Sequence, residues 1–208
     1  MEKAIIKTVA FMPRRADVSR SAFRDYYEER HAPLALNWFP FRKYVRNHLL
    51  DHEDIGFDSL SEFWVSDLGE TARLMDSEVG ETMRADERNF LDQPAIVSVR
   101  CDEVLVKGTA RGVDPAPTPK GLWFLHSDDD ADSQPLISAL AAIDAPRVTV
   151  DLLSRMWGAA PPYAAIVSIW SDADGPPASV QLPAGWRAGP FVRADACETP
   201  PERLRAIL

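Results

Sequence analysis

A proline-rich segment at residues 108–120 divides this chain of 208 residues and limits what each side can fold into. Three prolines stand at alternate positions from Pro115 to Pro119, with glycines on both sides. Proline fixes φ and lacks a backbone N–H, so this spacing favours neither a helix nor a central strand. Such a segment is typical of a semi-rigid connector. We therefore predict a first unit at residues 1–107 and a second at 121–208.

The same order of elements is found on both sides of this linker. Periodicity predicts strand, helix, strand, strand, helices and strand in the first unit, at about 3–12, 19–33, 42–50, 57–66, 67–91 and 95–106. The second unit repeats this βαββαβ order without its second helix, because residues 172–185 are too rich in proline and glycine. We expect an α+β fold of two tandem ferredoxin-like units whose antiparallel sheets stack face to face.

The composition restricts the possible partners. A formal net charge of -9 provides no cluster of Lys and Arg for a phosphate backbone, so we expect no nucleic-acid partner. No apolar run has the length of a membrane span and the start lacks a signal-peptide pattern, so we expect a cytoplasmic protein without membrane contact. The two cysteines, Cys101 and Cys197, lack the spacing of a disulfide framework or a zinc site.

The predicted helix at 19–33 carries a histidine on its apolar face. Steps of three and four residues from Phe23 reach Tyr27 and then His31, whereas Glu28 and its polar neighbours fall on the opposite, solvated side. An imidazole in the interior can act as a base, an acid or a charged group near neutral pH. His31 also precedes Pro33 in the last predicted turn, where a cation would stabilise the helix C-terminus, so a structural cap is the alternative.

The strand at 42–50 adds polar groups to one face. Alternation places Tyr44, Arg46 and His48 on one side, and puts Asn47 on the other. A face that is both aromatic and polar suits the wall of a pocket better than a dry core or open water.

These segments together resemble the EthD family of dimeric α/β-barrel proteins. The resemblance covers about residues 3–107 and is carried by Phe-x-x-Tyr-Tyr-x-x-x-His-x-Pro at 23–33, Tyr-x-x-Asn-His at 44–48 and Asp-Glu-x-x-Phe-Leu-Asp at 86–92. It implies that the two units form a barrel within one chain, with the second supplying the sheet that a partner subunit supplies in dimeric members. A homodimer is the other possibility. The motifs occur only in the first unit, so we expect the site there, with the second unit as scaffold.

Cofactor signals are weak. There is no Rossmann fingerprint or P-loop, which disfavours nicotinamide, Rossmann-bound flavin and nucleoside triphosphates. A metal bound by His31, His48 and Glu62 is conceivable, but these residues lack a short fixed ligand spacing. Haem is also conceivable, since some barrels of this architecture bind it through one histidine. We therefore predict no cofactor and no metal.

The resemblance implies proton-transfer chemistry on a small apolar, oxygenated substrate of aromatic, polyketide or lactone type. We predict a cofactor-independent lyase or isomerase, with His31 as general base and His48 as second acid/base. The substrate would contact the following side chains: Tyr27, Tyr44, Arg46, Trp38 and Trp64. The alternatives are a non-catalytic small-molecule-binding or assembly protein and a monooxygenase of the α/β-barrel type.

Overall fold

The structure is a computed structural model that describes residues 4–50, 55–110, 118–156, 158 and 160–204. The first unit contains β1 (Ile6–Met12), α1 (Arg20–Tyr26), a π-helical turn (Tyr27–His31), α2 (Ala32–Leu36), β2 (Lys43–Leu50), β3 (Ser59–Val65), α3 (Leu68–Met75), α4 (Glu78–Glu87), a 3-10 turn (Gln93–Ala95) and β4 (Val97–Lys107). The second unit contains β5 (Thr118–Ser127), α5 (Ser133–Leu140), β6 (Val148–Arg155), β7 (Ala165–Ile169), β8 (Trp186–Glu198) and a 3-10 turn (Pro201–Arg203). The element order follows the prediction in both units.

The strands close into one antiparallel barrel in the order β1-β3-β2-β8-β5-β7-β6-β4. Each unit contributes four neighbouring strands, and the units are joined where β2 pairs with β8 and β4 pairs with β6. Closure leaves no free strand edge in the barrel. The predicted α/β barrel within one chain is confirmed, and its two sheets share backbone hydrogen bonds at both seams as well as facing each other.

The structure describes the two ends of the predicted linker. Residues 111–117 of the predicted connector lie outside the described residues. β4 ends at Lys107, and β5 begins at Thr118, a few residues earlier than predicted. Among the described residues, no helix is both long enough and apolar enough to cross a membrane.

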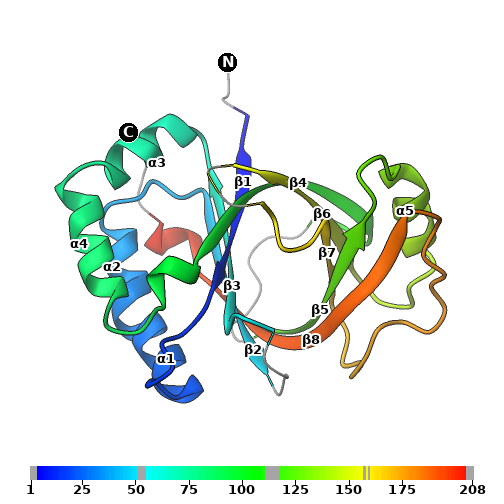
Figure 1. Ribbon diagram of the computed structural model, residues 1–208, viewed down its shortest axis with the longest axis horizontal. Coiled ribbons are helices and arrows are strands. Elements are labelled where there is room, and N and C mark those ends of the chain that lie inside the picture. Colours follow the sequence, from blue (N-terminus) through cyan, green and yellow to red (C-terminus); the bar gives the residue numbers. More distant parts are fainter. Residues whose placement is uncertain (1–3, 51–54, 111–117, 157, 159, 205–208) are drawn as a thin grey trace.

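Helices cover the two sides of the barrel unequally (Figure 1). α1 to α4 form a layer over the outer face of the first sheet, whereas α5 is the one α-helix described in the second unit. Residues 171–185, where a ferredoxin-like unit would have its second helix, are described without helix, as predicted. The first unit therefore has a deep interface between helices and sheet, and this interface holds the site.

The interior of the barrel has an apolar and a charged region. Side chains from both sheets fill the apolar region, including Val9, Phe11, Leu60, Leu122, Phe124 and Ile166. Toward the other end, the Lys7 ammonium lies 2.7 Å from Glu62 and 2.8 Å from Asp151, while Lys120 lies 3.0 Å from Glu62. Each of these four side chains is at least nine-tenths buried. Asn47 points into this region and donates to Glu62 at 2.7 Å, as strand alternation predicted.

The helical segment at residues 20–36 departs from the prediction at Pro33. It continues to Leu36 instead of ending at the proline, because a π-helical turn precedes α2 and the Ala32 N–H bonds back to the Tyr27 carbonyl. In a regular α-helix, the ring of Pro33 would clash with the carbonyl four residues earlier. The wider turn relieves this clash. His31 therefore lies inside a helical segment and is not a C-terminal cap.

Candidate functional site

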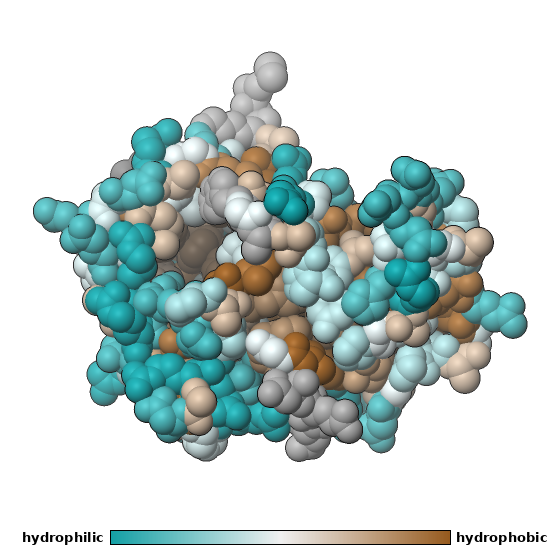
Figure 2. Space-filling view, in the orientation of Figure 1, coloured by the Kyte–Doolittle hydropathy of each residue, from teal (hydrophilic) through white to brown (hydrophobic). Residues whose placement is uncertain are grey.

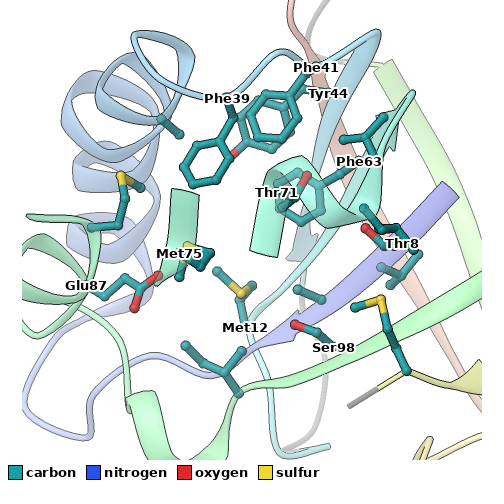
Figure 3. Close-up of a pocket in the computed structure, with 18 of the residues that line it drawn as sticks. Thr8, Met12, Phe39, Phe41, Tyr44, Phe63, Thr71, Met75, Glu87 and Ser98 are labelled. Atoms are coloured by element: carbon teal, nitrogen blue, oxygen red, sulfur yellow. The ribbon is translucent and has the colours of Figure 1, made fainter. Parts of the chain in front are cut away.

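A cavity of about 190 Å³ lies between the helical layer of the first unit and the outer face of its sheet. Figure 3 shows its labelled side chains converging from the helices and strands around it, and Figure 2 shows a hollow on the helical side of the molecule. A protein cavity of roughly 150 Å³ can bind benzene. The space is therefore suited to a substituted single ring or a molecule of similar size.

The wall of the cavity is mostly aromatic and methionine-rich. The aromatic side chains are Phe39, Phe41, Tyr44 and Phe63, and the methionines are Met12, Met75, Met83 and Met156. Stacking orders the aromatic part, since the rings of Tyr44 and Phe63 lie 5.0 Å apart at 17°. Gly80 lets α4 approach α3, because a β-carbon there would fall 1.9 Å from the Met75 carbonyl oxygen. Met156 follows β6, so the second unit contributes to this wall.

His31 lies in the cavity wall and is held by a carboxylate. Its ring is buried and packs against Tyr27 and Phe90, with a centroid distance of 5.0 Å to each. Its Nδ1 lies 2.8 Å from the Asp86 carboxylate, which also accepts a hydrogen bond from Tyr26. Burial alone would raise the pKa of Asp86, but these two hydrogen bonds hold it below its ordinary value.

The ionised Asp86 fixes the tautomer of His31. A carboxylate can only accept, so Nδ1 carries the proton of this hydrogen bond, which leaves Nε2 as the nitrogen with a lone pair in the neutral ring. A histidine oriented by a carboxylate in this way is prepared to accept a proton from a ligand. The arrangement of base, orienting carboxylate and apolar cavity can support proton abstraction.

The two predicted tyrosines form a buried hydroxyl chain behind this wall. Tyr44 donates to Tyr27 at 3.3 Å, and the Tyr27 hydroxyl lies 2.7 Å from the Ser61 hydroxyl. Burial raises the pKa of Tyr27 to about 12 and that of Tyr44 well above its ordinary value. Tyr44 thus presents its ring to the cavity, while its hydroxyl is engaged elsewhere. Tyr27 does not line the cavity.

His48 and Arg46 belong to a separate ionic cluster beneath α1. Glu28 accepts from Arg46 at 2.6 and 3.0 Å and lies 2.7 Å from Nε2 of His48. Burial opposes its charge, but the hydrogen bonds from His48 and Arg46 lower the pKa of Glu28 to about 2. The expectation that Glu28 faces solvent was therefore wrong. The Tyr27 ring separates the two predicted histidines, lying 5.0 Å from His31 and 5.7 Å from His48.

This cluster makes the stability of the protein depend on pH. Because the folded-state pKa of Glu28 is lowered, its contribution is present above pH 4.5 and is lost as the pH falls toward 2. We expect Glu28→Gln to lower the free energy of unfolding by roughly 1–3 kcal/mol at pH 7 and by less at pH 3. Urea unfolding at both pH values measures this, with exposed Glu29→Gln as control. Equal losses at pH 7 and pH 3 would contradict the ionic role.

The predicted tryptophans are not in the cavity. Trp38 is 40% exposed. Trp64 lies at the charged end of the barrel, with the Lys7 ammonium 4.5 Å from its ring centroid. The metal ligand set predicted from His31, His48 and Glu62 is also not assembled, because Glu62 points into the barrel whereas the histidines lie on its outer side.

Two other groups have metal-ligand spacing among the described residues. They are Glu28, His48 and Cys197, and Glu62, Glu103 and Asp151. A cationic side chain of the protein already bonds to each group, Arg46 in the first and Lys7 in the second. Both groups are therefore parts of internal ion-pair clusters.

Sequence reasoning did not assign five polar residues that the structure places at the site. Asp86 orients His31, while Thr8, Thr71, Glu87 and Ser98 line the cavity. The sequence signal for Asp86 and Glu87 was the Asp-Glu pair that opens the motif at 86–92. Thr8 and Ser98 are ordinary polar positions of strands, and no local pattern distinguishes them.

This architecture defines the class of protein: an α/β barrel of two ferredoxin-like units with a ligand-sized cavity in the first. Residues 15–94 match the EthD domain. This segment is therefore an EthD domain, as the sequence motifs indicated. No curated protein matches the chain.

Solved structures with low sequence identity share the fold over the whole chain. An anthrone oxidase-like protein is 10% identical with a TM-score of 0.59, and the match covers 99% of this chain and 97% of that one. A mutant chlorite dismutase from Candidatus Nitrospira defluvii is 9% identical with a TM-score of 0.54, covering 97% and 94% of the two chains. At this identity, the likeness establishes the fold.

Proposed function

We propose that this protein is a cofactor-independent lyase or isomerase that removes a proton from a small, flat, oxygenated substrate in the first-unit cavity. The observation that carries the proposal is the His31–Asp86 pair in an apolar wall. In this role Nε2 of His31 takes a proton from a carbon next to a carbonyl, and the electron pair moves into the carbonyl to give an enolate. Elimination, ring closure, decarboxylation and isomerisation can each proceed through such a step.

The enolate requires a hydrogen-bond donor that is not already engaged within the protein. Arg46 is bound to Glu28 and Thr199, and the Tyr44 hydroxyl donates to Tyr27. The hydroxyls of Thr8 and Ser98 line the cavity and are the available donors. We retain His31 as the base and Tyr44 as a ring contact. We assign His48 to orienting Glu28, which also binds Arg46.

Exchange of carbon-bound hydrogen tests the proposal without knowledge of the natural substrate. A panel of small aryl ketones and lactones in D₂O, followed by NMR, should show protein-dependent deuterium incorporation next to the carbonyl for at least one compound. A ligand that inhibits this exchange should do so competitively, with a stoichiometry of one site per chain. Absence of exchange across the panel, with binding retained, would favour the alternative of a non-catalytic small-molecule-binding protein.

Asp86 should control the tautomer of His31. In Asp86→Asn, the amide can donate to Nδ1, which moves the ring proton to Nε2 and removes the lone pair that faces the substrate. We expect the exchange rate to fall by roughly 10²-fold with little change in thermal stability. ¹⁵N NMR of the imidazole should show the proton moving from Nδ1 to Nε2. An unchanged tautomer with reduced exchange would contradict this role, and exposed Asp25→Asn is the matched control.

An oxygen-using reaction is the second candidate. An enolate formed in an apolar cavity is also the species that molecular oxygen attacks in cofactor-free oxygenation, and the same fold occurs in a protein described as anthrone oxidase-like. An oxygen electrode, run with the compounds that exchange deuterium, separates the candidates. Oxygen uptake in step with substrate loss would favour a monooxygenase, and the absorption spectrum of the purified protein would show whether a haem or flavin takes part.

A further inference from the structure

Polar side-chain atoms to which no described residue hydrogen-bonds also line the cavity. Glu87 accepts a hydrogen bond from Gln93 at its Oε2, at 2.8 Å, and no described residue donates to its Oε1. The hydroxyls of Thr8 and Ser98 have no side-chain hydrogen bond within the described part of the chain. Glu87 and Ser98 are half-buried and Thr8 is buried, so a ligand that fills the cavity displaces their water and must itself bond to them. These atoms therefore show where a ligand has its own polar groups.

The unsatisfied atoms lie on opposite sides of the cavity. Glu87 reaches in from the end of α4, whereas Thr8 on β1 and Ser98 on β4 lie across from it, with Met12 and Met75 between them (Figure 3). Thr8 and Ser98 are neighbours on the outer face of the sheet, because Ala10 pairs with Ser98 and Thr8 is two residues earlier. The cavity thus has an anionic acceptor at one end and two hydroxyls at the other, and the rest of its lining is apolar except for the side chains of His31, Tyr44 and Thr71.

We propose that Glu87 determines ligand specificity by accepting a hydrogen bond from a hydroxyl group on a compact aromatic ring, while Thr8 and Ser98 bind a carbonyl oxygen at the opposite edge. The ligand class is a hydroxylated aryl ketone or a related ring with a donor at one edge and an acceptor at the other. This inference rests on the proposed function only in placing the ligand in the same cavity as the substrate. A carboxylate accepts and cannot donate, so Glu87 rejects ligands that present an acceptor or a methyl group to it.

The size of the cavity and the chemistry of its walls support this class. About 190 Å³ suits one substituted ring. The stacked rings of Tyr44 and Phe63 and the methionine sulfurs favour an aromatic over an aliphatic ligand of the same volume. The carboxylate gives the larger discrimination, because a ligand that displaces water from a carboxylate without donating to it loses more than one that does so at a hydroxyl.

Calorimetric titration with 4-hydroxyacetophenone and acetophenone tests the proposal. These compounds differ only in the hydroxyl that Glu87 would accept. We expect the unmodified protein to bind 4-hydroxyacetophenone about tenfold more tightly or better, and Glu87→Leu to remove this preference. The control is Glu81→Leu, an exposed position of the same helix, which should keep it. Ser98→Ala should weaken both ketones alike by roughly two- to tenfold and leave the preference unchanged.

Several results would overturn the assignment of Glu87. They are failure of the unmodified protein to bind either ketone, equal binding of both, and a preference that survives in Glu87→Leu. Circular dichroism confirms that each variant is folded. The His31→Ala variant separates this inference from the proposed function. Suppose that His31→Ala still prefers 4-hydroxyacetophenone, while no compound of the deuterium panel exchanges in the unmodified protein. The binding assignment of Glu87 then stands and the catalytic proposal fails.

Discussion

His31→Ala is expected to lower protein-dependent deuterium exchange by about 10²–10⁴-fold, because the variant keeps the cavity but loses the only imidazole among the described residues that line it. The conservative His31→Gln tests the same point with less loss of packing against Tyr27 and Phe90. Exchange rates are measured by NMR beside thermal unfolding, so that loss of activity can be distinguished from loss of fold.

The matched control for this result is His126→Ala in the second unit. His126 packs on Tyr163, outside the cavity, so this variant should exchange at the rate of the unmodified protein. If His31→Ala and His31→Gln remain fully active and are only less stable, then His31 is a packing residue. The catalytic assignment would then be abandoned.

Lys7→Met is expected to destabilise the fold by about 3–5 kcal/mol, which is the usual cost of removing one partner from a buried ion pair. The ammonium of Lys7 contacts three carboxylates, those of Glu62, Glu103 and Asp151, at 2.5 to 2.8 Å. Without it, three negative charges remain close together in the barrel and repel one another. Urea unfolding at pH 7 measures the loss.

Two further variants show whether charge is the cause. Lys43→Met removes a partly exposed pair with Glu198 at 3.4 Å and should cost less than about 1 kcal/mol. Adding Asp151→Asn to Lys7→Met should restore part of the stability, because it removes one of the repelling charges. A double variant no more stable than Lys7→Met alone would show that packing, and not charge, determines the loss.

The pKa of Asp151 predicts how the same cluster responds to pH. Burial raises this pKa to about 6, and repulsion by Glu62 adds to it against the attraction of Lys7. The folded state therefore binds this proton more tightly than the unfolded chain does, so the contribution of Asp151 to stability increases as the pH falls from 7 toward 4. The pKa of Glu62 is lowered, so its contribution to stability is lost as the pH falls below its ordinary pKa.

The sequence by itself determined the order of elements and the faces of several of them. Periodicity in a strand or helix is a local property, so it correctly predicted that His31 would be buried with Phe23 and Tyr27 and that Asn47 would oppose Arg46. The missing helix of the second unit followed from proline and glycine alone. The motifs at 23–33 and 44–48 identified the EthD domain for the same reason, since they are local patterns.

Only the tertiary structure decided which polar groups meet. Lys7 and Asp151 come from different units and meet only because β1, β4 and β6 are neighbours in a closed barrel. Similarly, Asp86 reaches His31 through the packing of α4 against the π-helical turn, whereas the Tyr27 ring keeps His48 away from the cavity. Burial of a face is set by local periodicity, but the partner of a buried charge is set by long-range strand register and helix packing, which no local pattern records.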